Sequence, residues 1–213
     1  MHNTFVIWQG LSQLPGIQRC IQGFPNAHYR NRSLSPGAHS NLVWWERTLA
    51  QPGAFRTLVD RGRAVNRGIS VDASKEFGIG LRVHDAYLAW RWLPGALGQG
   101  GRDIGGAEAI GLEFALRYLR CIGVHGERTR VLGDNTSTIG AFNRGRGRNV
   151  WTNESVRRAW EVQEDIDGEL EVVYVRSAEN PADTVSRGDF RGLSSLECAF
   201  DIPLELTTFL ELV

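Results

Sequence analysis

The period of the hydrophobic pattern changes at Gly68, and this change constrains the fold more than any other feature of the 213-residue sequence. Upstream, apolar side chains recur at helical spacing from Ala38 to Leu49, after a Ser35-Pro36 pair typical of a helix start. Downstream, the pattern alternates with a period of two, which predicts short strands joined by short turns. We therefore expect an antiparallel meander. Its strands are predicted at 68–72, 78–83 and 87–93.

Helices and strands alternate after the meander. The order β-β-β-α-β-α-α-β-α predicts an α/β fold whose mixed five-stranded sheet has three antiparallel strands followed by two parallel ones, flanked by helices. A last short helix is expected to start at Asn180-Pro181, with the asparagine as its cap. The remaining helices are predicted at 106–122, 136–143 and 153–166, and the remaining strands at 128–134 and 170–175.

A glycine- and arginine-rich joint, Asp60-Arg61-Gly62-Arg63, divides the chain. We expect a helical segment over 1–62 and the mixed α/β domain over 63–192. Residues 193–213 contain four acidic and no basic residues. The sequence therefore predicts an acidic C-terminal tail with a helical stretch.

The formal net charge is zero, which argues against a protein held on nucleic acid by bulk electrostatics alone. Lys75 is the one lysine among 24 basic residues. Arginine suits forked phosphate contacts, although genomic base composition explains the bias equally well.

The scattered cysteines Cys20, Cys121 and Cys198 form no CxxC pair, which favours a reducing, intracellular location, cytoplasmic or nuclear. No apolar run approaches the roughly 20 residues of a membrane span. The oligomeric state is left open.

Four acids occupy strand ends and helix starts. Asp72 and Asp134 each follow a predicted strand, Glu108 lies on the buried stripe of a helix, and Asp183 lies near the start of the last helix. Each alone also fits a turn, cap or helix-dipole role. Together, on a sheet of this topology, they can meet at one edge, where their mutual repulsion requires cations. Oxygen ligands favour Mg²⁺ or Mn²⁺, and two ions about 4 Å apart can activate water and stabilise a leaving oxygen in phosphodiester hydrolysis.

The acid-containing segments resemble the four acid motifs of retroelement ribonucleases H. The similarity spans about residues 42–188 and implies an RNase H-like fold, a two-metal Mg²⁺ site and hydrolysis of RNA paired to DNA. Further similarity to fungal gypsy-like long-terminal-repeat elements implies the RNase H domain of a reverse transcriptase, with a polymerase domain as a possible partner. The four motifs are Val71-Asp72-Ala73-Ser74, Ala107-Glu108-Ala109, Gly133-Asp134-Asn135 and the segment from Asn180 to Arg187. The element-specific similarity lies in Leu42-Val43-Trp44-Trp45, 145–149, Asn153 and Arg157-Arg158.

A surface for an RNA–DNA hybrid is expected beside the acids, where arginines supply phosphate contacts and Trp151 an aromatic face. Two alternatives stay open: a solvated loop with Trp151 in the core, and Arg187 pairing with Asp183 along the helix. The predicted hybrid-binding residues are Ser74, Asn135, Arg144, Arg146, Arg148 and Arg187.

Other members of the superfamily fit the sequence less well. Proofreading exonucleases begin with an Asp-x-Glu pair, whereas position 74 is Ser, and integrases lack the helix acid matching Glu108. Many cellular ribonucleases H carry a histidine before the final helix, but residues 176–179 contain none; this departure concerns product release and rate and removes no metal ligand. A non-catalytic or domesticated RNase H-fold module that binds nucleic acid is the alternative function.

Overall fold

The computed structural model describes residues 8–23, 33–51, 62–98, 102–198 and 200–213. The chain divides into two units, Met1–Val59 and Asp60–Val213. Asp60 and Arg61 of the predicted joint lie outside the described residues. Among the described residues, no helix combines the length and the apolar character that a bilayer span needs.

The first unit contains a 3-10 turn, η1 (Trp8–Leu11), and the helices α2 (Pro15–Gln22) and α3 (Pro36–Ala50). The Ser35 hydroxyl accepts a hydrogen bond from the Ala38 N–H at 3.2 Å, as the Ser-Pro start predicts. Ala38 is buried, but Leu42 and Leu49 of the predicted stripe are 42% and 54% exposed. Helices α2 and α3 are joined instead through a buried amide, because Asn41 accepts from the Gly16 N–H at 2.9 Å.

A mixed sheet organises the second unit. The strand order is β5-β4-β1-β2-β3-β6, and β7 pairs with β3. Strands β1, β2 and β3 are antiparallel neighbours, while β1–β4 and β4–β5 are parallel pairs. This confirms the predicted α/β class and is the arrangement expected of an RNase H-like fold. The strands are β1 (Val65–Ala73), β2 (Gly78–Val83), β3 (Ala86–Trp92), β4 (Arg128–Gly133), β5 (Glu169–Tyr174), β6 (Ser194–Ser195) and β7 (Leu210–Leu212).

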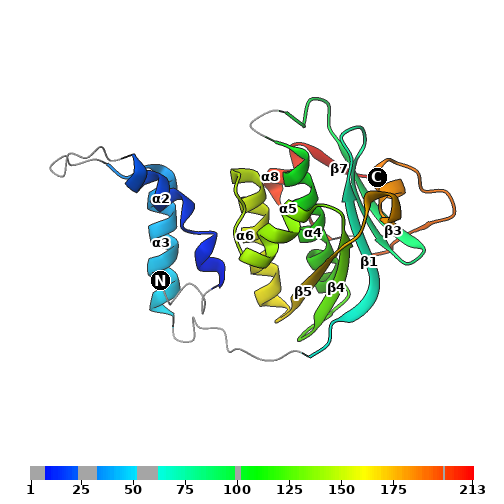
Figure 1. Ribbon diagram of the computed structural model, residues 1–213, viewed down its shortest axis with the longest axis horizontal. Coiled ribbons are helices and arrows are strands. Elements are labelled where there is room, and N and C mark those ends of the chain that lie inside the picture. Colours follow the sequence, from blue (N-terminus) through cyan, green and yellow to red (C-terminus); the bar gives the residue numbers. More distant parts are fainter. Residues whose placement is uncertain (1–7, 24–32, 52–61, 99–101, 199) are drawn as a thin grey trace. The chain divides into compact units, whose positions relative to one another are not determined.

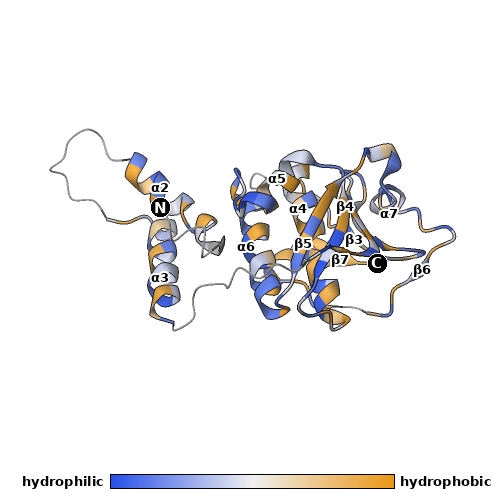
Figure 2. Ribbon diagram, turned by 60° about the horizontal axis from the view of Figure 1, so that its bottom comes forward, coloured by the Kyte–Doolittle hydropathy of each residue, from blue (hydrophilic) through white to orange (hydrophobic). Residues whose placement is uncertain are grey.

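Three helices cover one face of this sheet (Figure 1): α4 (Ile104–Cys121), α5 (Thr136–Arg144) and α6 (Val150–Asp165). In Figure 2, α6 carries both hydrophobic and hydrophilic residues, as a helix with one buried face should. It starts earlier than predicted, because Asn149 caps it by accepting from the Thr152 N–H at 2.7 Å. Helix α4 packs closely on the sheet, since a Cβ at Gly111 would lie 3.3 Å from the Val71 Cβ.

The segment expected as an acidic tail belongs to the second unit and adds two short strands, β6 and β7, to the five expected. It also contains α8 (Leu204–Thr207). Its apolar residues Leu206, Phe209 and Leu210 are buried in the core. The four acids of the segment are exposed, and Glu211 pairs with Arg91 at 2.8 Å. The apolar residues therefore pack the segment onto the second unit, although its acidic composition predicts a solvated tail.

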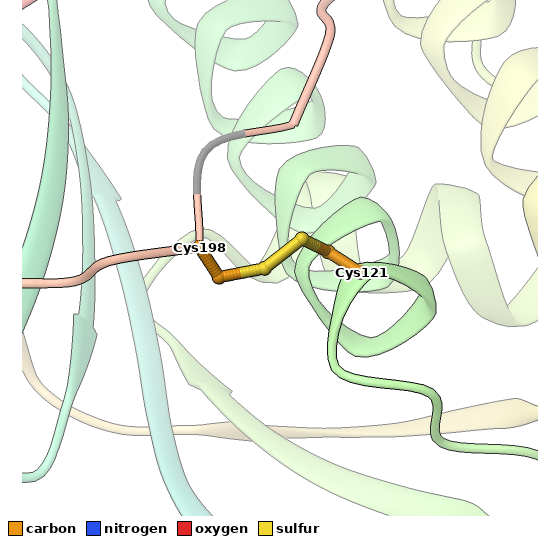
Figure 3. The surroundings of a disulfide bond; sticks show 2 residues. All are labelled: Cys121 and Cys198. Carbon is orange, nitrogen blue, oxygen red and sulfur yellow. A yellow bond between two sulfur atoms is a disulfide. The ribbon is translucent and has the colours of Figure 1, made fainter.

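A disulfide joins Cys121, at the end of α4, to Cys198 in the C-terminal segment (Figure 3). These two cysteines are paired although they form no CxxC motif. Because 77 residues separate the two cysteines, their spacing in the sequence gives no sign of the bond. Disulfides persist mainly in oxidising surroundings, so the cysteines no longer support a reducing compartment.

The short helix α7 (Asp183–Ser186) lies on the opposite face of the sheet (Figure 1). It starts at Asp183 with Ala182 at the cap position, later than the predicted start at Asn180. The Asn180 side chain is used differently: its Nδ2 donates to the Val71 carbonyl at 2.9 Å and its Oδ1 accepts from the Ala182 N–H at 3.2 Å. Asn180 thus attaches the segment before α7 to β1.

Close contact between α7 and β2 requires a glycine at position 80. A Cβ there would lie 2.5 Å from the Ser186 nitrogen, and backbone atoms cannot move aside cheaply. We expect Gly80→Ala to lower the free energy of unfolding by about 1–3 kcal/mol, as overpacking does. Gly105→Ala is the control, because its new Cβ would meet only Asp103 at an ordinary 3.6 Å. Chemical denaturation of both variants measures the difference, and equal stabilities would contradict the packing argument.

Candidate metal centre

Three carboxylates from separate elements meet at one edge of the sheet. Asp72 lies near the end of β1, Glu108 in α4 and Asp134 directly after β4. One ligand oxygen from each lies within 4.8 Å of the others. Asp72 and Glu108 are buried, at 3% and 6% exposure, and Asp134 is half-buried. The structure therefore brings together three of the four predicted acids.

The parallel pairing of β1 with β4 produces this arrangement. Ser70 and Leu132 are partners in the register, so Asp72 and Asp134 each follow two residues later at the same edge. Helix α4 crosses this edge near its N-terminal end, where the Asp103 side chain caps it by accepting from the Gly106 N–H at 2.8 Å. Glu108 is the fifth residue of α4, and the Ala73 N–H at the end of β1 is near enough to its carboxylate to favour the ionised form. Glu108 therefore faces the end of β1.

The electrostatics of the cluster are unfavourable without a cation. Burial raises the pKa of the Asp72 carboxyl to about 6; the neighbouring acids add to this rise, and a hydrogen bond from Ser186 opposes it. Burial also raises the pKa of Glu108 to about 9, and the charges of Asp72 and Asp134 contribute. In both groups the low dielectric and the like charges disfavour the ionised form.

One carboxylate oxygen of the cluster has no hydrogen-bond partner among the residues that the structure describes. Asp134 Oδ1 is buried and accepts no hydrogen bond from any of the described residues. Such an atom normally costs about 1–3 kcal/mol unless water or an ion satisfies it. Together with two carboxylates whose pKa values are raised by burial, it fits a hard divalent cation with oxygen ligands, such as Mg²⁺ or Mn²⁺.

Asp183 lies at the margin of this group. Its charge contributes to the raised pKa of Asp72, so the two acids are near each other. Its carboxylate is bonded by Arg187, whose Nε donates to both oxygens at 3.0 Å and whose Nη2 lies 2.9 Å from Oδ1. The side chain of Arg187 is 58% exposed. The i,i+4 pairing considered from the sequence is thus present.

Two of the predicted hybrid-binding residues have local structural roles. Ser74 is buried; its hydroxyl donates to the Ser186 carbonyl and accepts from the backbone N–H groups of Phe77 and Gly78. It therefore holds the turn between β1 and β2. Asn135 caps α5, accepting from the N–H groups of Ser137 and Thr138.

The predicted arginines Arg144, Arg146 and Arg148 are exposed around the loop between α5 and α6. Arg144 and Arg148 line a cavity of about 110 Å³ beside α4 and α5. Trp151 does not offer a free aromatic face. It is half-buried and packs against Gly106 and the Phe209 ring, whose centroid is 5.5 Å away. The loop therefore offers guanidinium groups without an exposed tryptophan.

Two residues of the site were missed. Ser186 donates to the Asp72 carboxylate across 114 residues, and Asn180 bonds the Val71 carbonyl across 109. Both lie in the segment that carries the fourth acid motif. The motif therefore contained both residues, but it gave Asn180 only a capping role and Ser186 no role.

No protein-family model matches the chain, and no curated protein does. Among solved structures, the chain is similar to the crystal structure of RNase H1 from the halophilic archaeon Halobacterium salinarum, with 17% sequence identity and a TM-score of 0.40. The match covers 59% of this chain and 97% of that chain. At this similarity, the fold assignment rests on the strand order and helix placement, and the site on its own geometry.

The raised pKa values predict how pH affects the metal-free protein. Unfolded Asp and Glu lose their protons near about pH 4, whereas folded Asp72 and Glu108 keep theirs to about pH 6 and about pH 9. The folded state therefore binds more protons in this interval, and stability falls as pH rises. For Glu108 the fall should be on the order of 1 kcal/mol per pH unit at most. Thermal melts with chelator should show it between about pH 6 and about pH 9.

Glu108→Gln should flatten this fall, because an amide does not ionise. Glu164→Gln, an exposed position on α6, should leave it unchanged. If the melting temperatures of wild type and Glu108→Gln fell equally with pH, the raised pKa would not belong to Glu108.

Proposed function

We propose that this chain hydrolyses the RNA strand of RNA–DNA hybrids in a reaction that depends on two Mg²⁺ or Mn²⁺ ions. The observation that carries the proposal is the convergence of Asp72, Glu108 and Asp134, with one buried oxygen unsatisfied. An α/β sheet of this topology supports the same class of nuclease. The motif resemblance extends the proposal to a fungal gypsy-like retroelement reverse transcriptase, of which the chain is a part or a descendant. An intracellular location, cytoplasmic or nuclear, stays part of the proposal, and the Cys121–Cys198 disulfide argues against it.

In this proposal the chain has a connection-like helical segment over 1–62 and a catalytic domain over 63–192. Residues 193–213, although acidic, contribute to the core of that domain. A polymerase domain is the proposed partner of the connection-like segment.

The carboxylates would act as ligands. Bound metal ions would supply Lewis acidity, which makes water nucleophilic at neutral pH and stabilises the leaving oxygen. The chain would contribute the negative charge of these carboxylates. The Ser186 hydroxyl holds Asp72 by a hydrogen bond, and the Ala73 N–H lies near Glu108. Asp183 would complete the set at little cost, because its bond to the exposed Arg187 is a surface ion pair worth about 0–1 kcal/mol.

The hybrid would approach along the loop between α5 and α6. The end of this loop lies beside the start of α4, the helix that carries Glu108, because the Asn149 Nδ2 donates to the Asp103 Oδ2 at 2.9 Å. Arg144, Arg146 and Arg148 would contact phosphates there. Arg187, exposed beside Asp183, would add a further phosphate contact once released.

One observation favours the alternative of a non-catalytic binding module. Arg187 already neutralises Asp183, and a fold that had lost its metal would use such a pair as a substitute. Hydrolysis of the hybrid separates the two functions, because a binding module would retain the hybrid without cutting it.

Asp134→Asn tests the catalytic proposal. The wild type should cut the RNA strand of a labelled hybrid with Mg²⁺ or Mn²⁺ and stop with chelator, whereas Asp134→Asn should lose at least about 100-fold in rate, since catalytic metal sites need their charged ligands. Asp165→Asn, an exposed aspartate on α6, is the matched control and should cut normally. Matched duplex DNA and duplex RNA should stay intact. Full cleavage in excess chelator would refute the mechanism.

Replacing Arg144, Arg146 and Arg148 together by alanine should weaken hybrid binding and flatten its salt dependence. The log-log slope should fall by roughly 0.7 to 0.9 for each phosphate that the variant no longer neutralises. A second triple variant, with Arg120, Arg157 and Arg191 replaced by alanine, removes the same charge at positions where each arginine pairs with an acid. It should keep the wild-type slope. Equal slopes for both variants would mean that the loop is a solvated surface that makes no phosphate contacts.

A further inference from the structure

We propose that Ser186 is a positioning residue of the metal centre: its hydroxyl holds one carboxylate oxygen of Asp72, so that the other stays directed at a divalent cation. The inference rests on the proposed metal-dependent function and goes beyond it, because Ser186 itself would touch neither the ions nor the hybrid. Ser186 is fully buried, with 0% exposure.

The hydroxyl of Ser186 contacts two of the four acids at once. Its Oγ donates to Asp72 Oδ2 and also lies 2.9 Å from the backbone carbonyl of Asp183. A serine hydroxyl has one proton to donate, so the two oxygens compete for it. A charged acceptor makes the stronger hydrogen bond, and the proton therefore goes to the ionised Asp72. The carbonyl contact keeps the hydroxyl in reach of that carboxylate.

Further contacts fix Ser186 itself. The Ser74 hydroxyl donates to the Ser186 carbonyl at 2.5 Å, and Gly80 lets the α7 backbone approach β2. Asn180 bonds the Val71 carbonyl, directly before Asp72. Hydrogen bonds thus run in both directions between residues 71–74 and 180–186. The position of the serine is set by the backbone of two elements rather than by its own rotamer alone.

Loss of the hydroxyl would release the Asp72 carboxylate. Asp72 is 3% exposed, so water would not readily replace the bond. A buried oxygen without a partner is costly, and the carboxylate would turn toward another donor. Removing a group that orients a metal ligand typically weakens metal affinity about 10- to 100-fold.

The test compares two buried serines in the full-length protein. Ser70 lies on β1 two residues before Asp72, is 1% exposed, and its hydroxyl has no hydrogen-bond partner within the described part of the chain. Each variant therefore removes one buried serine Oγ. The Oγ lost in Ser186→Ala contacts a carboxylate, whereas the Oγ lost in Ser70→Ala does not. Calorimetric titration of chelator-treated protein with Mn²⁺, without hybrid, should show affinity about 10-fold weaker or worse for Ser186→Ala. Ser70→Ala should match the wild type.

Cleavage assays add a readout that a purely structural role would not move. In Ser186→Ala, the Mg²⁺ concentration for half-maximal cleavage should rise by a similar factor, while KM for the hybrid stays unchanged. A variant that melts at lower temperature but binds Mn²⁺ as the wild type does would overturn the inference. If Ser186→Ala does not fold, Ser186→Cys decides: its weaker S–H donor should give an intermediate loss, and wild-type affinity would overturn the proposal.

The wild type separates this inference from the proposed function. Wild-type protein that binds no Mn²⁺ would overturn both. Wild-type protein that binds Mn²⁺ but leaves the hybrid intact would overturn only the proposed hydrolysis, because the Mn²⁺ titrations of the two serine variants still test the positioning role.

Discussion

Repulsion among carboxylates that share a buried sheet edge is the constraint on which the second unit depends. Parallel strands β1 and β4 end side by side, so the acids that follow them cannot separate without breaking the ladder. Helix α4 then adds Glu108 to the same edge, and the pKa of that residue rises to about 9. Such an arrangement is unfavourable for a purely structural protein. It becomes favourable when cations occupy the edge, which is why the electrostatic cost itself indicates function.

The site is built from both faces of the sheet. Alternation along β1 directs Val71 toward α4 and Asp72 toward Ser186 in α7. Strand β1 therefore contacts both layers. Helix α4, which carries Glu108, lies on one face, and the short helix α7, which begins at Asp183, lies on the other. The four-residue α7 has too few internal hydrogen bonds to be stable alone. Its position depends on the contacts that Asn180 and Ser186 make with β1, so the fourth acid is placed by tertiary bonds rather than by helix propensity.

Strong periodicity made most of the second unit predictable from the sequence. The meander, the later parallel strands and α4 follow from patterns that extend over several residues, and the acids follow from motifs with a specific order. Short elements escaped, because β6 and β7 contain two and three residues and carry almost no local signal. The Cys121–Cys198 disulfide and the hydrogen bond from Asn180 to β1 were not predicted, for a related reason. Both join residues that are distant in the sequence, and local propensity carries no information on such contacts.

The C-terminal segment illustrates how such a distant contact reaches the site. Phe209 packs on the Trp151 ring, and the Arg102 guanidinium lies 4.4 Å from the centroid of Phe209. Trp151 in turn fills the space that a side chain at position 106 would need, two residues before Glu108. The segment expected as a tail therefore supports the first turn of α4. That turn fixes where Glu108 enters the carboxylate cluster. The apolar residues of the C-terminal segment therefore help to stabilise the cluster, although the acidic composition of the segment predicts a solvated tail.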